Sequence, residues 1–218
     1  MKKTLQLICI IFLSTQTIHA QLFVGAKGGY NRYFEPGMNG GNIALFTEVP
    51  LGEYYNSSVR ASIFYDFPMK YEDVGTIYAY PDSYLFDDHV PVYSKYQNAG
   101  ISVEYMHYFS EDAFESTLYA GGKVGFSYST IKRTIGDFNT SDYYLNDYVK
   151  DNKQFSVYLG VCLGYQFALS HNSFLFIEFN TGFPFLQLNG SDAGSSSISG
   201  YPIIMVAGNI GFKQSIFN

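Results

Sequence analysis

Seven charged residues are the best candidates for chemistry in this sequence. They occur about once in each segment of alternating polar and apolar residues, and their charge changes sign from one to the next along the chain. The seven are Lys27, Glu48, Arg60, Glu104, Lys123, Glu178 and Lys213. Each falls on the polar side of a segment in which polar and apolar residues alternate. If those sides share one narrow interior, opposite charges on neighbouring segments should pair, because an unpaired buried charge is far costlier than a paired one. On this arrangement Glu178 compensates Lys213, which meets Lys27 where the first and last segments join. We predict a salt-bridged plug; the alternative is an ion or proton path.

A second group of reactive side chains lies in the long polar stretch between residues 67 and 94. His89 could act as a base oriented by Asp87 or Asp88, with Ser94 as the nucleophile of a lipid-modifying enzyme. A solvated acidic loop accounts for the same residues, because a catalytic triad is recognised by geometry and not by proximity in sequence. We therefore predict that the protein is not an enzyme.

Two further features raise the question of a bound metal. Asp137, Asp142 and Asp147 could hold a calcium ion, but their spacing matches no EF-hand loop. Cys162 has no evident His or Cys partner, so we expect it to fill space and not to ligate. The sequence predicts no metal site and no cofactor.

Tyrosines are concentrated in the longest connecting segments. Such residues offer large contact area at small entropic cost, which favours binding of an extracellular protein or glycan. Crowded packing among the loops is an equally good explanation. The candidates for binding are Tyr78, Tyr80, Tyr84, Tyr143 and Tyr144.

The elements that must position these groups are segments of alternating polarity. In FSVYLGVCLGYQFALS, residues 155–170, one parity is apolar for sixteen residues, whereas an ordinary soluble strand has about five or six. Eight such segments recur, an even number as in single-chain bacterial barrels. Their apolar parities are marked by Val24, Leu45, Ile63, Val103, Val124, Leu159, Ile177 and Ile210.

The connections between these segments alternate between short and long. Short turns fall near residues 53, 113 and 171, and long segments cover 33–42, 67–94, 130–152 and 187–200. An up-and-down meander then places all short turns at one end, as in outer-membrane barrels. The parity opposite the apolar one is mostly Gly, Ser, Tyr and Asn, which suits a narrow polar interior better than the wet exterior of a soluble barrel or sandwich. We predict an all-β, eight-stranded, antiparallel, up-and-down transmembrane β-barrel.

Composition and the N-terminus indicate an exported protein. Residues 1–20 carry Lys2, Lys3 and an apolar run and end at Ala20, which is typical of a signal peptide. The barrel domain would then span residues 21–218, in the outer membrane of a Gram-negative bacterium. Loss of the two lysines moves the net charge from −6 to −8, which argues against a nucleic-acid partner. Only one cysteine would remain, so no intramolecular disulfide can form.

Five short motifs give the chain a resemblance to a known family. It resembles the PorT-like outer-membrane β-barrels of Bacteroidetes, which share the architecture of the small OmpX and OmpA-type barrels. The resemblance implies recognition by the barrel-assembly machinery, contact with outer-membrane lipid and, for some members, an accessory part in protein secretion. The motifs are FVGAKGGYN (23–31), FTEVPLG (46–52), YAGGKVGF (119–126), LGYQF (163–167) and NIGFKQSIF (209–217).

The function that the sequence favours is non-enzymatic. We expect a barrel with a side-chain-filled interior, because eight strands enclose little more than side chains, and a structural or surface-binding role through its long extracellular loops. The alternatives are a small-solute pore, an accessory component of protein secretion and a lipid-modifying enzyme.

Overall fold

The computed structural model describes residues 21–34, 37–51, 55–81, 84–110, 114–145, 151–189 and 204–216. The expected signal peptide, residues 1–20, lies outside the described residues, as does Asp147. No helix in the described ranges is long and apolar enough to cross a membrane.

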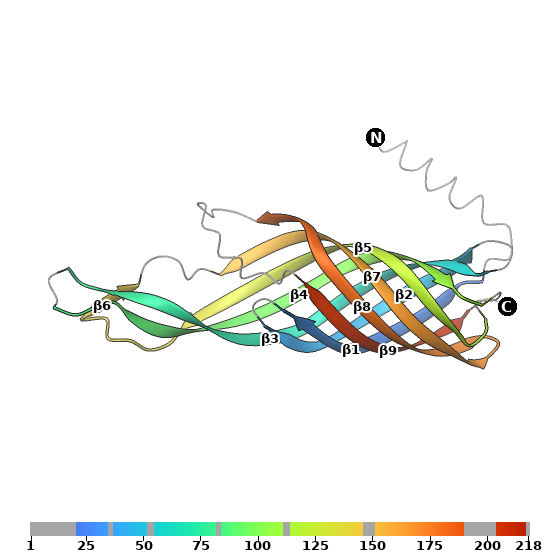
Figure 1. The fold of residues 1–218 in the computed structure, drawn as a ribbon, viewed down its shortest axis with the longest axis horizontal. Coiled ribbons are helices and arrows are strands. Elements are labelled where there is room, and N and C mark those ends of the chain that lie inside the picture. The colour runs from blue at the N-terminus through green and yellow to red at the C-terminus, as the bar shows by residue number, and fades with distance from the viewer. Residues whose placement is uncertain are drawn as a thin grey trace, which may run out of the picture.

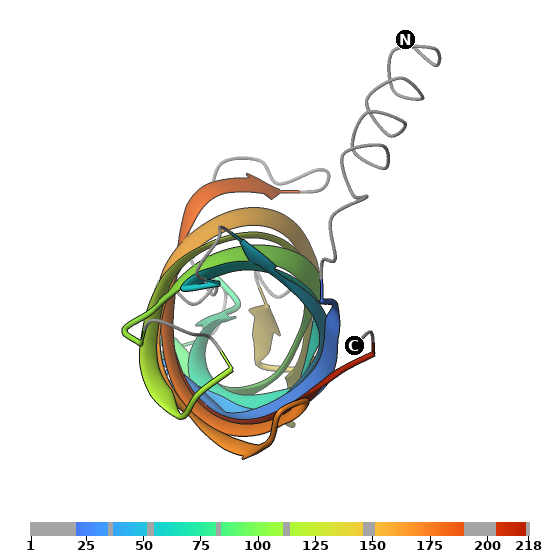
Figure 2. The same cartoon turned by 90° about the vertical axis from the view of Figure 1, so that its right-hand side faces the viewer.

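Eight long antiparallel strands form a closed barrel. Each pairs with its neighbours in chain order, β9 pairs with β1, and the β2–β3 pairing completes the ring. Figure 2 looks down the barrel, so that its strands form a ring around the lumen. The predicted fold is thereby confirmed. The strands are β1 (Phe23–Tyr33), β2 (Asn39–Leu51), β3 (Ser57–Ala79), β4 (Asp88–Tyr108), β5 (Thr117–Ile135), β7 (Asn152–Ser170), β8 (Ser173–Asn189) and β9 (Met205–Ser215), with a short β6 (Tyr143–Leu145) outside the ring.

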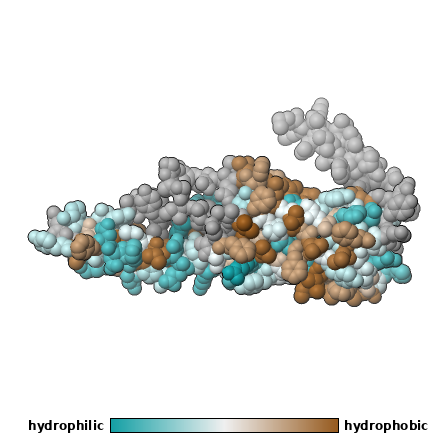
Figure 3. Space-filling view, viewed as in Figure 1, coloured by the Kyte–Doolittle hydropathy of each residue, from teal (hydrophilic) through white to brown (hydrophobic). Residues whose placement is uncertain are grey.

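The apolar parity of each strand faces outward, as the alternation predicts. On β7, Val161 is 57% exposed, whereas its neighbour Cys162 on the other parity is buried. Phe179 on β8 and Ile210 on β9 are likewise exposed by about 60%. Apolar side chains therefore cover much of the barrel in the space-filling view (Figure 3). Such an exterior is stable only against hydrocarbon, where a closed sheet leaves no backbone edge unpaired.

The two ends of the barrel differ in the way the sequence predicts. Few residues separate β2 from β3, β4 from β5 and β7 from β8, and these strand ends lie together at one end of the barrel, which we call the short-turn end (Figure 1). The opposite end, which we call the long-loop end, has the connections β1–β2, β3–β4, β5–β7 and β8–β9. The expected long segment over residues 33–42 is wrong, because β1 ends at Tyr33 and β2 begins at Asn39.

A second expectation at the long-loop end is also wrong. Residues 67–94 were expected to form a long loop, but β3 and β4 continue through most of it as a paired ribbon, in register from Met69↔Tyr96 to Ile77↔Asp88. β5 continues beside β4 as far as Val92↔Ile135, and β6 pairs with β3 near the tip. We call this protruding sheet the extension: residues 69–79, 88–96, 131–135 and 143–145 (Figure 1). Adjacent charged residues, such as Glu72 and Asp73, hide the alternation of polarity, although Ile77, Val90 and Val92 are buried on one face of the extension.

Two layers of large side chains cross the lumen. The layer toward the short-turn end consists of Phe46, Met106, Tyr108, Tyr119, Cys162 and Phe176. The second layer lies where the extension leaves the barrel and consists of Tyr33, Met38, Met69, Tyr96 and Ile131. The interior is thus a packed core, as expected for eight strands.

The assignment of faces predicts a position-dependent cost for an added charge. Val161→Arg should lower the free energy of unfolding in lipid vesicles by about 2 to 4 kcal/mol, because the guanidinium would sit near the middle of the apolar belt. Thr134→Arg places the same side chain on an exposed position of the extension and should change the free energy by less than about 0.5 kcal/mol. Urea titration followed by the heat-dependent gel shift measures both. Equal losses at the two positions would show that the faces are wrongly assigned.

Candidate functional site in the barrel lumen

All seven charged residues singled out from the sequence lie inside the barrel. Their side chains come from seven of the eight strands and are at most 9% exposed. The remaining strand, β7, contributes the buried thiol of Cys162. Four cations thus face three carboxylates in one enclosed space.

Glu178 connects opposite sides of the lumen. Its Oε1 lies 2.6 Å from Nζ of Lys27, and its Oε2 lies 2.6 Å from Nη1 of Arg60. The hydroxyl of Tyr119 donates to Oε2 at 2.9 Å, and the amide of Asn180 donates to Oε1 at 2.8 Å. Since β3 and β8 lie four strands apart in the ring, the Arg60–Glu178 pair spans the barrel.

A second carboxylate, Glu48, is held from two sides. Nη2 of Arg60 lies 3.0 Å from its Oε2, and Nζ of Lys213 lies 2.7 Å from its Oε1. The hydroxyl of Tyr108 donates to the same Oε1 and accepts a bond from Lys213 at 2.9 Å. Every oxygen of this fully buried carboxylate therefore has a cationic partner, which is the condition for burying a charge at tolerable cost.

Glu104 is the third carboxylate and has looser partners. Its oxygens lie 3.5 Å from Lys27, 3.4 Å from Arg60 and 3.7 Å from Lys123. Through Glu104 the charges join into one continuous network from Lys123 to Lys213.

Aromatic rings surround the cations of this network. The guanidinium of Arg60 lies 4.5 Å from the ring centroid of Phe46 and 5.1 Å from that of Phe176. Nζ of Lys213 lies 4.9 Å from the ring of Phe23 and 5.4 Å from that of Phe174. A desolvated cation gains more from a ring face than an exposed one does, so these contacts both fill the lumen and offset part of the desolvation cost.

Inward-facing glycines make room for these rings. A Cβ atom added to Gly25 would lie 2.3 Å from Cζ of Phe46, and one added to Gly164 would lie 2.3 Å from Cζ of Tyr119. The glycine-rich polar parity of the sequence is therefore the small half of a small-to-large packing pattern, as in other small barrels.

From β2 to β5 the charges pair between neighbouring strands, as the sequence predicts, but the expected pairing of Glu178 is wrong. Glu178 was expected to compensate Lys213, but it binds Lys27 and Arg60, while Lys213 reaches past β1 to Glu48. The lumen is narrow enough for long side chains to cross it, so strand adjacency alone does not decide the partners.

Sequence reasoning also missed Asp66, which anchors a separate polar cluster toward the long-loop end. Its oxygens accept hydrogen bonds from Asn31 at 2.6 Å, Tyr33 at 2.6 Å and Asn98 at 2.9 Å. The available signal was its parity, because Asp66 is six residues from Arg60 on the same inward face of β3.

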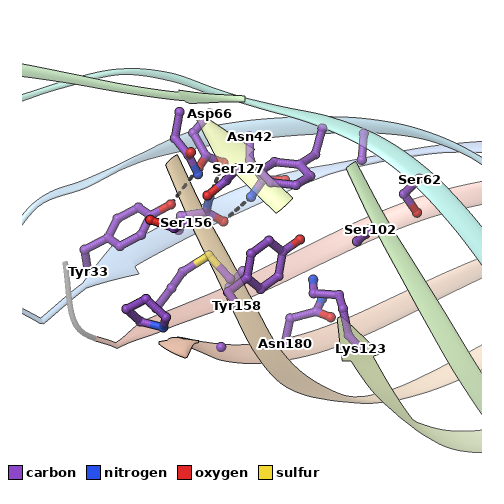
Figure 4. Close-up of a pocket in the computed structure, with 18 of the residues that line it drawn as sticks. Tyr33, Asn42, Ser62, Asp66, Ser102, Lys123, Ser127, Ser156, Tyr158 and Asn180 are labelled. Atoms are coloured by element: carbon purple, nitrogen blue, oxygen red, sulfur yellow. Dashed lines mark hydrogen bonds between the residues drawn. The ribbon is translucent and has the colours of Figure 1, made fainter. Parts of the chain in front are cut away.

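Between the charged network and the Asp66 cluster lies a polar chamber of about 100 Å³. Figure 4 shows Lys123, Asn180 and Ser102 toward one end and Tyr33 and Asp66 toward the other. This volume exceeds the roughly 10–15 Å³ that one water needs, so the chamber can hold several waters against its serine and asparagine side chains.

The catalytic candidates do not come together. His89 is exposed, whereas Ser94 on the same strand is buried on the opposite face. Oδ1 of Asp87 accepts a bond from the backbone of Ala79, and Oδ1 of Asp88 accepts one from the backbone of His89. The geometry of a nucleophile, base and orienting carboxylate is not formed here.

The metal candidates gain no support from the described residues. Asp142 accepts a hydrogen bond from Asn139, and Asp137 is an exposed residue. Elsewhere, potential ligand atoms of Glu104, Cys162 and Glu178 lie within 4.8 Å of one another. Both carboxylates are already ion-paired with Lys27 and Arg60, so an added cation would enter a site with surplus positive charge.

The candidate binding tyrosines lie on or beside the extension. The ring of Tyr144 on β6 lies 5.7 Å from that of Tyr78 on β3 and 5.4 Å from that of Tyr80. Tyr143 pairs through its backbone with Ala79. Tyr84, between β3 and β4, is fully exposed. Three of the five, Tyr78, Tyr143 and Tyr144, therefore lie in strands and not in loops.

Two solved structures resemble this barrel. Neisserial surface protein A aligns with a TM-score of 0.52 over 89% of this chain and 97% of its own, at 12% sequence identity. A major outer membrane protein from Thermus thermophilus aligns with a TM-score of 0.51 over 90% of this chain and 99% of its own, at 14% identity. No protein-family model matches the chain, and no curated protein matches it by sequence. At such identities the likeness establishes the fold alone.

The network predicts that Glu178 supports the barrel more than an exposed carboxylate does. Glu178→Gln removes the charge between Lys27 and Arg60 at nearly constant volume, and should lower the free energy of unfolding by about 3 to 5 kcal/mol, because two cations lose their closest partner. The control is Glu72→Gln on the exposed surface of the extension, with an expected change below about 0.5 kcal/mol. Urea unfolding in vesicles measures both, and an unfolding curve of Glu178→Gln that coincides with that of the wild type would contradict the plug.

Proposed function

We propose that this chain is an outer-membrane protein whose closed barrel holds a rigid β-extension at the cell surface for binding an extracellular protein or glycan. One observation carries the proposal: the barrel strands β3 and β4 continue, past a β-bulge between Asp66 and Met69, into a paired extension with an aromatic tip. The described side chains in the lumen leave little space for solute, and the extension offers an exposed contact surface.

The membrane location rests on the apolar exterior and on the signal peptide expected at residues 1–20. With the usual orientation of bacterial barrels, the short-turn end faces the periplasm and the extension faces outward. We assign the protein on these grounds to the outer membrane of a Gram-negative bacterium, with insertion by the barrel-assembly machinery.

The tip of the extension has the side chains of a contact surface. Tyr84 is fully exposed and Phe86 is 88% exposed. The ring of Tyr144 packs against those of Tyr78 and Tyr80. Tyrosine contributes large contact area while losing only two side-chain torsions on binding. The strand pairing beneath the tip fixes its backbone before binding, which reduces the entropic cost of association.

Membership of the PorT-like family is a narrower proposal, supported by the order of the five sequence motifs. A part in protein secretion follows from that resemblance only. The binding role is preferred because it rests on the exposed aromatic tip, whereas no described residue of the lumen or extension singles out secretion, and the geometry of a lipid-modifying triad is not formed.

A closed lumen predicts poor conduction. In planar bilayers the wild-type barrel should show no stable openings of the size of a general porin, because ion-paired and aromatic side chains occupy the lumen. Arg60→Ser removes the side chain that reaches all three carboxylates and should raise the frequency of openings. Large, stable openings of the wild type would establish a pore in place of a plug.

The binding role predicts that the aromatic tip can be removed without loss of the fold. The purified barrel in nanodiscs should bind at least one member of a panel of immobilised glycans and matrix proteins. Tyr84→Ser combined with Phe86→Ser should weaken that binding about tenfold or more, since exposed aromatic anchors carry much of an interface's energy.

The control for that experiment is Val74→Ser, which removes an exposed apolar side chain of the extension away from the tip. Its binding should equal that of the wild type. The proposal fails if the wild type binds no member of the panel, or if the tip variant binds as tightly as the control.

A further inference from the structure

A row of lysines crosses the outer surface of the barrel where the extension begins. Lys70 on β3 is the register partner of Lys95 on β4, and Lys95 is in turn the partner of Lys132 on β5. Register partners point to the same face of a sheet, and all three side chains are exposed. Lys153 on β7 lies opposite Thr130, one step along the same face from Lys132. We call these four residues the lysine row.

Like charges directly opposite each other across strands are destabilising. Among the described residues, no carboxylate lies within ion-pair distance of any member of the lysine row. Glu72 is on the same face two residues from Lys70, and Asp151 is two residues from Lys153. The carboxylate of Asp151 accepts a hydrogen bond from the backbone N–H of Arg133. The row therefore has a surplus of positive charge that the described part of the chain leaves poorly compensated.

The lysine row lies close to the apolar belt. Toward the short-turn end lie the outward aromatic residues Phe67 on β3, Tyr128 on β5 and Phe155 on β7, each 40–49% exposed. The polar side chains of Gln97 and Thr130 lie between the row and the belt on β4 and β5. Lysine stems can lie along such apolar surface while the ammonium groups reach into the polar layer above it. The four ammonium groups are thus placed at the depth of lipid headgroups.

The Lys and Arg residues on the outer surface of the barrel are concentrated near the lysine row. After residue 20 the sequence has eleven Lys and Arg residues, of which four lie in the lumen. The other described cations, Arg32, Arg133 and the lysine row, are all in the long-loop halves of their strands. The outer surface near the short-turn end has no Lys or Arg in the described residues. One leaflet therefore meets a cationic rim and the other does not.

We propose that the lysine row binds the phosphate groups of a lipid headgroup in the leaflet at the long-loop end. Adjacent phosphates of one headgroup can bridge neighbouring ammonium groups, which relieves the like-charge repulsion across the strands. The acyl chains of the same molecule lie against the aromatic side chains below the row. A lysine side chain near the membrane surface is attracted to anionic lipid, and several lysines together strengthen the binding.

The test measures lipid retention by the full-length mature barrel in detergent, by native mass spectrometry. The probes are a glucosamine-disaccharide lipid with two phosphates, the same lipid without phosphate, and inorganic phosphate. The wild type should retain the phosphorylated lipid, and added salt should weaken retention because exposed charges are screened. Lys70→Gln, Lys95→Gln and Lys132→Gln together should weaken retention about tenfold or more.

Arg32→Gln serves as the control, because Arg32 is an outward cation on β1, outside the lysine row, and its loss should leave retention unchanged. If the triple variant does not show the heat-dependent gel shift of a folded barrel, Lys95→Gln alone, at the centre of the row, is tested in its place. Tyr84→Ser with Phe86→Ser should retain lipid fully, so failure of the surface-binding function and failure of the lipid site give different results.

Three results would overturn the lipid site. They are equal retention by the triple variant and the wild type, equal retention of the phosphate-free lipid, and displacement of the lipid by equimolar inorganic phosphate. The last result would show a site for free phosphate in place of a lipid headgroup.

Discussion

The ion pair between Arg60 and Glu178 spans the barrel, and the arrangement of the lumen depends on it. These side chains start on opposite strands and meet at 2.6 Å, with Lys27, Glu48 and Glu104 completing one connected set of charges around them. A barrel of eight strands must fill its interior with side chains. Here the filling is charged, so each member is stable only while its partners stay in place.

This constraint accounts for features that look separate in the sequence. Inward glycines leave space for Phe46 and Tyr119, and those rings in turn lie against the guanidinium of Arg60. The outward parity is free of charge until the strands leave the apolar belt, where the lysine row begins. Beyond the belt the strands are constrained by neither hydrocarbon nor lumen, and there β3 and β4 carry the residues that we propose contact the outside.

The sequence predicted the ring of eight strands, its faces and its seven inward charges, because a period of two in hydrophobicity reports directly on which side chains share a face. It predicted the pairing between neighbouring strands from β2 to β5. It did not predict the partners of Glu178 and Lys213, because long side chains cross the narrow lumen and Lys213 reaches Glu48 past β1. The extension was missed because its sequence lacks a clear alternation of polarity. On β3 the adjacent charges of Glu72 and Asp73 break the hydrophobic alternation, although one face of the extension, with Val90 and Val92, is buried. The inward position of Asp66 could have been predicted from its parity alone, because it shares the inward face of β3 with Arg60.

The central claim is that Arg60 and Glu178 stabilise the barrel through each other and not independently. A double-mutant cycle tests it most directly, with Arg60→Met, Glu178→Leu and both together, by urea unfolding in vesicles. We expect a coupling energy of about 2 kcal/mol or more, since residues in one buried network are strongly non-additive, and the double variant should be more stable than the sum of the single losses allows. Additive losses, within about 0.5 kcal/mol, would contradict the account.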